Sequence, residues 1–366
     1  MQQSRTPRNR RKQVSEQWVE TMRKLSLALF GLAPCFLLHP ANTQSAPQDD
    51  STHLRMNVVL VQLSVAVTDG KGNYVNGLRP EDFEVTEDKI PQKVSSFEEG
   101  SGTGAVPDSG DADQSLAGKS ISSKDGQPGD IQVQSASNLP PEPHGNQASV
   151  FVLFDTSNYM YRGFVFAQDA ITDFIRSMDN ASRVAFYSYC RDLSRAMQLT
   201  SDHFRIVNAV RSTVAGDDAA LYNSLLLTVK DAAPLKGRKA IVVFSNGPDN
   251  ASSVPPEDVA ELAQSTGTII YIISTRQAED DPASAAAFER MSKVSGGKAY
   301  FAKNWLDEKK AFASIRNDLV HLYTLSYYPQ ANQNRGWRSI KVRLVGKDLQ
   351  KYHLRTRDGY RLVAQR

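Results

Sequence analysis

Between residues 148 and 323 the chain alternates short apolar runs with segments in which apolar residues recur every three or four positions. The short runs predict strands buried on both faces, and the longer recurrence predicts amphipathic helices. The predicted strands are 149–154, 183–189, 193–199, 240–244, 268–273 and 298–301, and the predicted helices are 163–178, 201–213, 221–233, a helix starting at Pro255 and Pro256, 284–294 and 308–320. Strands spaced by helices form a parallel sheet with right-handed crossovers. We therefore expect an α/β fold with a mostly parallel sheet and helices on both faces.

Two segments with strand patterning flank this unit, residues 55–99 and residues 324–364. The first is rich in β-branched residues with a turn at 69–73, and the second contains the cleanly alternating run 339–345. Neither segment is long enough to bury a core of its own. We therefore expect the two to pair into one β-sandwich, with the α/β domain of residues 148–323 inserted between them.

Residues 100–147 consist of Gly, Ser, Asp, Pro and Gln with almost no large apolar residue. Such a composition cannot bury enough surface to offset the entropy of the chain. The segment is predicted to be a disordered linker.

The N-terminal residues 1–46 combine a basic segment, the apolar run 25–38 and small polar residues, in that order. This order is typical of a secretory signal peptide, and the apolar run is too short to span a bilayer. A buried helix and an uncleaved anchor are the alternatives, while Pro34 argues against lipidation at Cys35. We expect cleavage near Ser45 or Ala46 and a secreted, periplasmic or cell-envelope protein, without a transmembrane span in the mature chain.

The charge balance changes once the leader is set aside. The leader holds seven of the 43 basic residues and two of the 40 acidic ones, which leaves 36 basic against 38 acidic. No basic patch then remains to indicate a nucleic-acid partner. Cys190 is the one cysteine outside the leader, so no intramolecular disulfide is expected in the mature chain.

Asp155 and Ser157 stand where the predicted strand 149–154 ends. Ligands of open α/β sheets bind beyond the carboxyl ends of the strands, so this place is a candidate ligand site. Signs of an enzyme are missing from the sequence, which has no His-x-x-x-His pair and no Gly-x-Ser-x-Gly elbow. The run 294–298 precedes a strand, which is the wrong order for a phosphate loop.

Several motifs, in order along residues 148–323, resemble the von Willebrand factor type A domain. Asp155-Thr-Ser157 resembles the start of that family's Asp-x-Ser-x-Ser motif, and the segments 216–222 and 244–250 resemble two further loops. The segments 77–88, 323–329 and 357–360 resemble a bacterial exported subgroup of type A proteins. The resemblance implies a Rossmann-like domain whose first loop opens a metal-ion-dependent adhesion site.

In the family, two serine hydroxyls, one threonine hydroxyl and two carboxylates supply that site. Asp155 and Ser157 match the pattern, but Tyr159, Ala219 and Asn246 stand in place of a serine, the threonine and an aspartate. Mg²⁺ requires hard oxygen ligands in near-octahedral geometry. The resemblance, with these departures, implies a degenerate metal site and no bound cofactor.

Three aspartates near these positions offer an alternative. Asp217 and Asp218 adjoin Ala219, and Asp249 follows Asn246 by three residues. Together with Asp155 they would suit Ca²⁺, which accepts irregular oxygen cages. The other interpretation is that these aspartates cap helices and loops, as aspartate commonly does.

The expected function is that of an exported, non-enzymatic module that binds a protein at the C-terminal edge of the α/β sheet, through the loops 156–162, 215–220 and 246–252. The candidate contact residues are Tyr159, Met160, Tyr161, Asp217, Asp218 and Asn246. Alternatively, residues 159–161 fold back into the metal pocket. Two further hypotheses are a metal-dependent adhesion module using Asp155, Ser157, Asp218 and Asp249, and an envelope-associated hydrolase with an unrecognised site.

Overall fold

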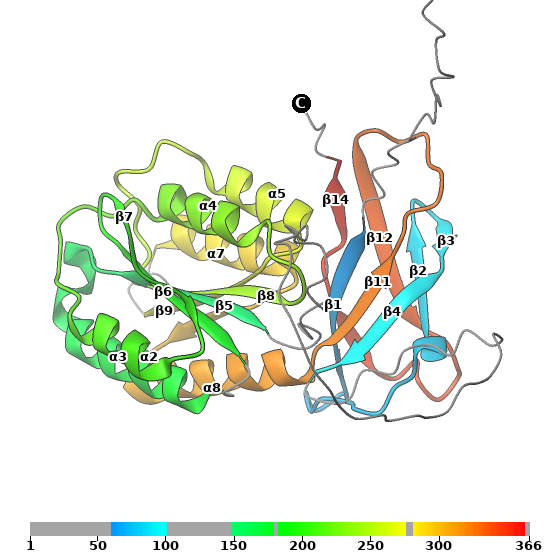
Figure 1. The fold of residues 1–366 in the computed structure, drawn as a ribbon, viewed down its shortest axis with the longest axis horizontal. Helices are drawn as coiled ribbons and strands as arrows, with labels where there is room; N and C mark the ends of the chain where they lie inside the picture. Colours follow the sequence, from blue (N-terminus) through cyan, green and yellow to red (C-terminus); the bar gives the residue numbers. More distant parts are fainter. Residues whose placement is uncertain (1–59, 101–147, 179–181, 276–280, 363–366) are drawn as a thin grey trace, which may run out of the picture. The chain divides into compact units, whose positions relative to one another are not determined.

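A computed structural model describes residues 60–100, 148–178, 182–275 and 281–362. The predicted leader and nearly all of the predicted linker lie outside these residues. The central element is a six-stranded sheet with the order β10-β9-β8-β5-β6-β7 (Figure 1). Its strands are β5 (Ser149–Asp155), β6 (Arg183–Tyr189), β7 (Leu193–Thr200), β8 (Lys239–Ser245), β9 (Ile269–Thr275) and β10 (Ala299–Ala302). Every pairing is parallel except that of β6 with β7, which confirms the predicted fold class.

The antiparallel edge strand β7 departs from the strict alternation of strands and helices. Only three residues separate β6 from β7, so no crossover helix fits between them. A connection of this length can make only an antiparallel hairpin. The parallel part of the sheet therefore ends at β6.

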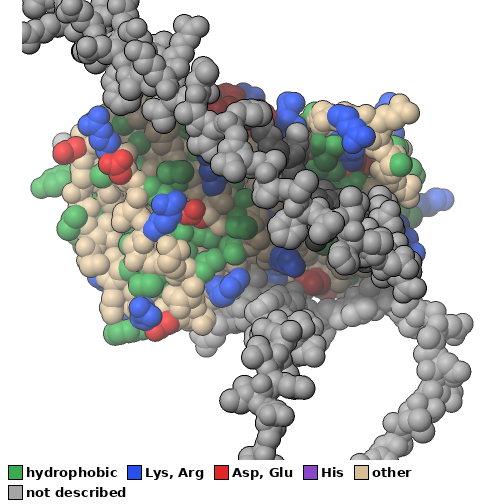
Figure 2. Space-filling model, turned by 45° about the horizontal axis from the view of Figure 1, so that its top comes forward, with side chains coloured by type: hydrophobic (Ala, Val, Ile, Leu, Met, Phe, Trp, Pro, Cys, Tyr) green, Lys and Arg blue, Asp and Glu red, His purple; other side chains and the backbone are tan. Residues whose placement is uncertain are grey.

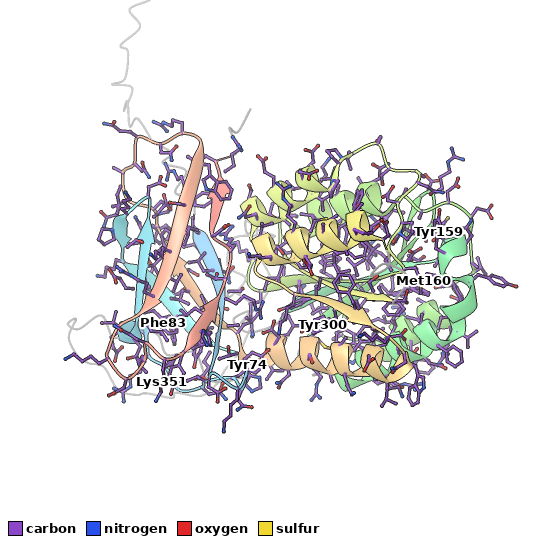
Figure 3. All side chains as sticks on the ribbon, turned by 180° about the vertical axis from the view of Figure 1, so that it is seen from behind. Tyr74, Phe83, Tyr159, Met160, Tyr300 and Lys351 are labelled. Atoms are coloured by element: carbon purple, nitrogen blue, oxygen red, sulfur yellow. The ribbon has the colours of Figure 1, made fainter. Side chains whose placement is uncertain are left out.

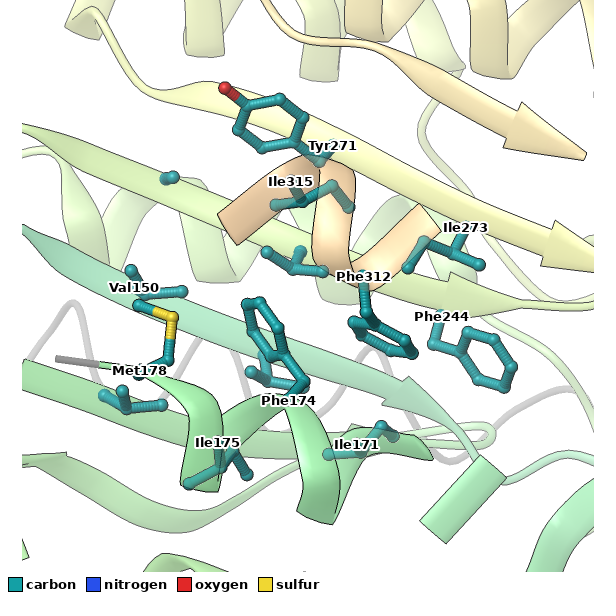
Figure 4. Packing of buried hydrophobic residues seen from close by; sticks show 14 of the residues in the cluster. Val150, Ile171, Phe174, Ile175, Met178, Phe244, Tyr271, Ile273, Phe312 and Ile315 are labelled. Carbon is teal, nitrogen blue, oxygen red and sulfur yellow. The ribbon is translucent and has the colours of Figure 1, made fainter. Parts of the chain in front are cut away.

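Helices cover both faces of this sheet because its strands are apolar on both sides. Val150, Val152 and Phe154 of β5 pack into one buried cluster, and Phe151 and Leu153 pack into another. Figure 4 shows the first cluster, in which side chains of the covering helices meet those of the strands. The first face is covered by α2 (Phe164–Ser177), α3 (His203–Arg211) and α8 (Trp305–His321), and the second by α4 (Leu221–Ala232), α5 (Pro256–Thr266) and α7 (Pro282–Ser295).

Helix α8 begins one turn earlier than the periodicity predicts. Its N-cap is Asn304, whose side chain accepts hydrogen bonds from the backbone amides of Leu306 and Asp307. A cap of this kind stabilises a first turn whatever its apolar pattern. Periodicity alone therefore placed the start at residue 308, too far along the chain.

The flanking segments form two four-stranded antiparallel sheets, in the orders β13-β1-β11-β4 and β14-β12-β2-β3. Their strands are β1 (Val61–Thr68), β2 (Phe83–Glu87), β3 (Ile90–Gln92), β4 (Val94–Glu99), β11 (Tyr323–Tyr327), β12 (Trp337–Leu344), β13 (His353–Arg355) and β14 (Gly359–Arg361). Strand β1 pairs with β11 and β2 pairs with β12, so each sheet combines strands from both segments. The buried side chains of both sheets share one cluster.

Strand β3 was not predicted from the sequence. It forms a tight hairpin with β2, in which Asp88 and Lys89 adopt positive φ angles of 48° and 70°. Two-residue hairpin turns favour positive φ at both central positions, because this twist matches that of the strands. Asp88 holds the turn by accepting hydrogen bonds from the backbone and hydroxyl of Ser339.

Among the residues that the structure describes, helices with the length and apolarity of a membrane span are absent.

Candidate functional site

The site predicted from the sequence lies at the carboxyl end of β5. Asp155 ends this strand and is fully buried. Its carboxylate accepts hydrogen bonds from the backbone amide of Ser157 at 2.9 Å and from Ser245 Oγ at 2.8 Å. The hydroxyl of Tyr189 donates in turn to Ser245 Oγ at 3.0 Å. Burial raises the pKa of Asp155, and the hydrogen bonds oppose that rise.

Ser157 lies beside this carboxylate at the start of the 3₁₀ helix η2 (Asn158–Gly163). Its side chain is fully buried, and none of the described residues gives its hydroxyl a hydrogen-bond partner. A buried hydroxyl without a partner is uncommon in folded proteins. Ser157 therefore carries the one buried side-chain oxygen without a hydrogen-bond partner among the described residues that the sequence placed at this site.

Asn246 closes the site from the end of β8. Its side-chain amide donates to the backbone carbonyl of Tyr159, and its oxygen accepts from Thr275 Oγ1 at 2.6 Å. Asn246 is buried, with 7% of its surface exposed, and both ends of its side-chain amide bond within the domain. The amide thus ties the first loop to the strand ends.

Only 1% of Met160 is exposed, which agrees with the alternative that this part of the loop folds inward. Its side chain belongs to the buried cluster that includes Val152, Phe154 and Ala167. The 3₁₀ turn directs it inward, since Met160 N donates to the Ser157 carbonyl. Figure 3 shows Tyr159 and Met160 at the end of the sheet away from the antiparallel strands. Tyr159 is half-buried, and Tyr161 is 76% exposed.

The carboxylate of Asp249 caps the first turn of α4. It accepts hydrogen bonds from the backbone amide of Tyr222 at 2.9 Å, in the first turn of α4, and from that of Ser252 at 2.8 Å. This is the capping interpretation offered from the sequence, with the aspartate satisfying amides that the helix leaves free. Asn250 supports the same loop by accepting from the amide of Ala219 at 2.8 Å.

Asp217 and Asp218 lie in the exposed loop before α4. Asp218 forms an ion pair with Arg191 at 3.7 Å between exposed side chains, and Asp217 accepts a bond from the Asn158 amide through its backbone carbonyl. Across the described ranges, no three acidic, histidine or cysteine side chains are grouped closely enough to hold a metal ion. The structure therefore does not bring Asp155, Asp218 and Asp249 together as a cation cage.

An exposed apolar surface next to this edge was missed from the sequence. Phe166 in the first turn of α2 is 64% exposed, and Trp305, the first residue of α8, is 56% exposed. Between them lies a hollow of about 270 Å³ lined by Phe166, Asp169, Ala170, Trp305, Glu308 and Lys309. We call Tyr161, Phe166 and Trp305 the apolar rim.

Phe166 shares the helical spacing of the buried Ala170 but is itself exposed, so its spacing alone does not show where it lies. The groove between α2 and α8 is not filled at this end. Phe204 of α3 has the helical spacing of the buried Val207 in the same way and is 74% exposed. On the visible face of the α/β part, basic side chains lie beside acidic ones (Figure 2). This arrangement agrees with the charge balance of the chain outside its leader.

A mostly parallel α/β sheet with helices on both faces defines a Rossmann-like fold. Residues 149–314 match the family model of the von Willebrand factor type A domain, and this part of the chain is a type A domain. No curated protein matches the chain.

Several solved structures are similar to this domain. BatB from Bacteroides thetaiotaomicron is 16% identical, with a TM-score of 0.40, over 47% of this chain and 97% of its own. A von Willebrand factor type A protein from Catenulispora acidiphila is 11% identical, with a TM-score of 0.41, over 55% and 63%. The corresponding domain of the type V pilus tip protein Mfa5 from Porphyromonas gingivalis is 12% identical, with a TM-score of 0.40, over 47% and 94%.

Proposed function

We propose that this protein is an exported, non-enzymatic interaction protein whose type A domain binds another protein at the carboxyl edge of its sheet. The apolar rim carries this proposal. Its three residues are large and exposed; Tyr161 lies in the loop that follows β5, and Phe166 and Trp305 line one hollow. A few residues supply most of the binding energy of a protein interface, and tryptophan and tyrosine are enriched among them. The export part rests on the signal-peptide pattern of residues 1–46.

The surroundings of the rim favour a partner that inserts an apolar side chain. Lys309 lies 5.4 Å from the ring centre of Trp305 and pairs with Asp173 at 3.2 Å, while Asp169 pairs with Arg211. Asp169 and Lys309 are thus matched within the domain, whereas Glu308, the third charged residue of the hollow, forms no ion pair among the described residues, and burial raises its pKa. A neutral, apolar anchor would displace water from the hollow without breaking either ion pair.

The oxygen donors at the end of β5 do not fit the Mg²⁺ site of the family. Both carboxylate oxygens of Asp155 already accept hydrogen bonds, the methyl group of Ala219 offers no donor, and the Asn246 side chain bridges Tyr159 and Thr275. Only the unpartnered hydroxyl of Ser157 supports the alternative of a metal-dependent adhesion module. We therefore propose that the partner is recognised without a metal ion.

Millimolar Mg²⁺ or Ca²⁺ is accordingly expected to leave the melting temperature unchanged, because a ligand stabilises a protein only above its dissociation constant. The triple variant Tyr159→Ser, Ala219→Thr, Asn246→Asp restores two hydroxyls and one carboxylate. It should gain about 2–4 °C at a Mg²⁺ concentration ten times its dissociation constant. Thermal unfolding with and without each ion measures both effects. A rise in the natural protein that Asp155→Asn abolishes would favour the adhesion-module alternative.

Partner binding is tested by the double variant Phe166→Ser, Trp305→Ser. Removing two exposed aromatic anchors should weaken binding at least about 30-fold, since an anchor residue contributes about 2 kcal/mol or more. The purified chain is cross-linked to envelope proteins of its host, and the captured partner is then titrated against each variant. Phe204→Ser, an equally exposed phenylalanine on α3, is the matched control and should bind normally. If the double variant binds the partner as well as Phe204→Ser does, the apolar rim is not the contact surface.

A further inference from the structure

A second cavity, of about 520 Å³, lies at the amino ends of the strands of the α/β sheet, whereas Asp155 lies at a carboxyl end. Lys239, the first residue of β8, and Gly267, just before β9, line it from the sheet side. Val61 of β1, Tyr328 just after β11 and Tyr360 of β14 line it from the antiparallel sheets. Pockets at such junctions between structural layers are common binding sites.

Two buried cations face this cavity. Lys239 and Arg357 both line it and are less than one-tenth exposed. Lys239 Nζ donates to the backbone carbonyls of Ala233 and Leu235, at 2.8 and 3.0 Å. Arg357 likewise donates to two backbone carbonyls, those of Gln264 and Gln62. All four acceptors are neutral, so these bonds satisfy donors but do not cancel charge.

The cavity carries no compensating negative charge. Its lining contains no aspartate or glutamate, and in the described part of the chain neither Lys239 nor Arg357 forms an ion pair. A third cation, the exposed Lys236, stands at the rim. Burial and the nearby charge of Arg357 lower the pKa of Lys239 to about 8. Glu87, which does not line the cavity, raises the pKa of Arg357, and Arg357 lies over the ring of Tyr360 at 5.6 Å, so Arg357 is partly compensated. Among the charges that act on Lys239, by contrast, only that of Arg357 is resolved. Buried charges are normally paired, so two neighbouring cations without an ion pair at the cavity indicate room for an anion.

Donors remain available for such an anion. An ammonium group has three N–H donors and a guanidinium group has five, and each of these two side chains uses two. Beside the cations stand the rings of Tyr328 and Tyr360 and the side chain of Leu235. The cavity thus combines a cationic wall with an apolar wall.

We propose that this cavity binds a small molecule carrying a carboxylate or phosphate group, with the oxyanion against Lys239 and Arg357 and an apolar portion against Tyr328 and Leu235. The site goes beyond the proposed partner surface and lies at the other edge of the sheet. Either one can therefore be disproved without affecting the other.

Binding should weaken as the pH rises above 8. The titratable groups lining the cavity are Lys236, Lys239, Tyr328, Arg357 and Tyr360. Burial lowers the pKa of Arg357 only to about 10 and raises that of Tyr360 to about 12, so Lys239 is the buried group that changes charge near pH 8. An oxyanion favours protonated Lys239, so affinity should fall up to about tenfold between pH 7 and pH 9.

The test is titration calorimetry of the full chain with inorganic phosphate, acetate and benzoate at constant ionic strength. Benzoate should bind several-fold more tightly than acetate, because only benzoate has an apolar part for the second wall. Lys239→Met should weaken binding more than tenfold. Lys236→Glu changes an exposed residue at the mouth of this cavity, where the fold does not depend on it. It should weaken binding of the anion about threefold or more. Lys341→Met, at an exposed lysine of β12, is the control and should bind like the natural protein.

The three ligands also separate the possible sources of the anion. Tighter binding of phosphate than of benzoate would assign the site to a phosphate-bearing molecule, and the reverse order to an organic carboxylate. The proposal is overturned if none of the three binds saturably. It is equally overturned if binding is the same in Lys236→Glu, Lys341→Met and the natural protein.

Discussion

Changing Asp318 to asparagine should lower the free energy of unfolding by about 3–5 kcal/mol, the cost of removing one partner from a buried ion pair. Asp318 lies on α8 and is fully buried. It accepts hydrogen bonds from the hydroxyls of Tyr74 at 2.7 Å and Tyr271 at 2.5 Å, and Arg355 of β13 donates to both of its carboxylate oxygens. All the groups around it are donors.

Asparagine would remove the charge opposite Arg355 and would also turn an N–H group toward these donors. The loss matters for the whole described unit, because the contacts join separate elements. Tyr271 belongs to β9 of the central sheet, whereas Arg355 belongs to the antiparallel sheets. Tyr74 adds a ring stacked on His321 of α8 at 5.0 Å between centres, and Figure 3 shows it at that end of the helix. Asp318 therefore fastens α8 to both the central sheet and the antiparallel strands.

Urea denaturation followed by circular dichroism measures the change. Asp307→Asn is the control on the same helix, where the carboxylate is partly exposed, accepts a hydrogen bond from Asn304 Nδ2 at 3.0 Å and pairs with Lys310 at 3.5 Å. We expect it to cost less than about 1 kcal/mol. Arg355→Met added to Asp318→Asn should cost less than the two separate losses combined, because both remove the same pair. A loss below 1 kcal/mol for Asp318→Asn would contradict this role.

The second large effect is expected for Glu87→Gln, again about 3–5 kcal/mol. Glu87 ends β2, is fully buried, and pairs with Arg338 of β12 at 2.8 Å. Its other carboxylate oxygen accepts from the hydroxyls of Tyr327 at 2.8 Å and Tyr360 at 3.0 Å. Tyr327 is in β11, so one carboxylate joins strands of both antiparallel sheets.

Strand β2 supplies its own control for this experiment. Glu84 pairs with Arg343 of the same partner strand at 3.0 Å, but the two side chains are 41% and 56% exposed. Glu84→Gln is expected to change the free energy of unfolding by less than about 1 kcal/mol, because water screens an exposed pair. Because the same glutamate-to-glutamine change is made at both positions, a larger loss of stability for Glu87→Gln is due to the burial of its ion pair. Equal effects of the two variants in urea denaturation would rule that explanation out.

The segment 357–360, which ends in Tyr360, shows what the structure adds to a pattern found in the sequence. Residues 77–88, 323–329 and 357–360 were singled out only by resemblance. In the structure, Glu87, Tyr327 and Tyr360 meet at one buried carboxylate. Gly359, which directly precedes Tyr360, has no room for a side chain, since an added Cβ would lie 2.5 Å from the carbonyl oxygen of Arg338. Linear spacing could not show that these distant positions are in contact.

The sequence by itself determined the local structure of the α/β domain and its class. Apolar runs and helical periodicity depend on neighbouring residues, so they placed β5, β6, β8 and β9 and the helices between them within a few residues. The same local information identified Asp155 and Ser157 as the end of a strand. It failed where a single residue changes the local geometry, as in the cap at Asn304 and the positive φ angles at Asp88 and Lys89.

Only the tertiary structure decided which of the candidate residues are accessible and which are already engaged. Exposure depends on what packs against a side chain from elsewhere in the chain, and a periodic pattern does not contain that information. Met160 and Asn246 are buried, although both follow the carboxyl ends of strands, and Phe166 is exposed, although it has the spacing of a core residue. The cavity with Lys239 and Arg357 likewise arises from residues 118 positions apart, which only the pairing of distant strands brings together.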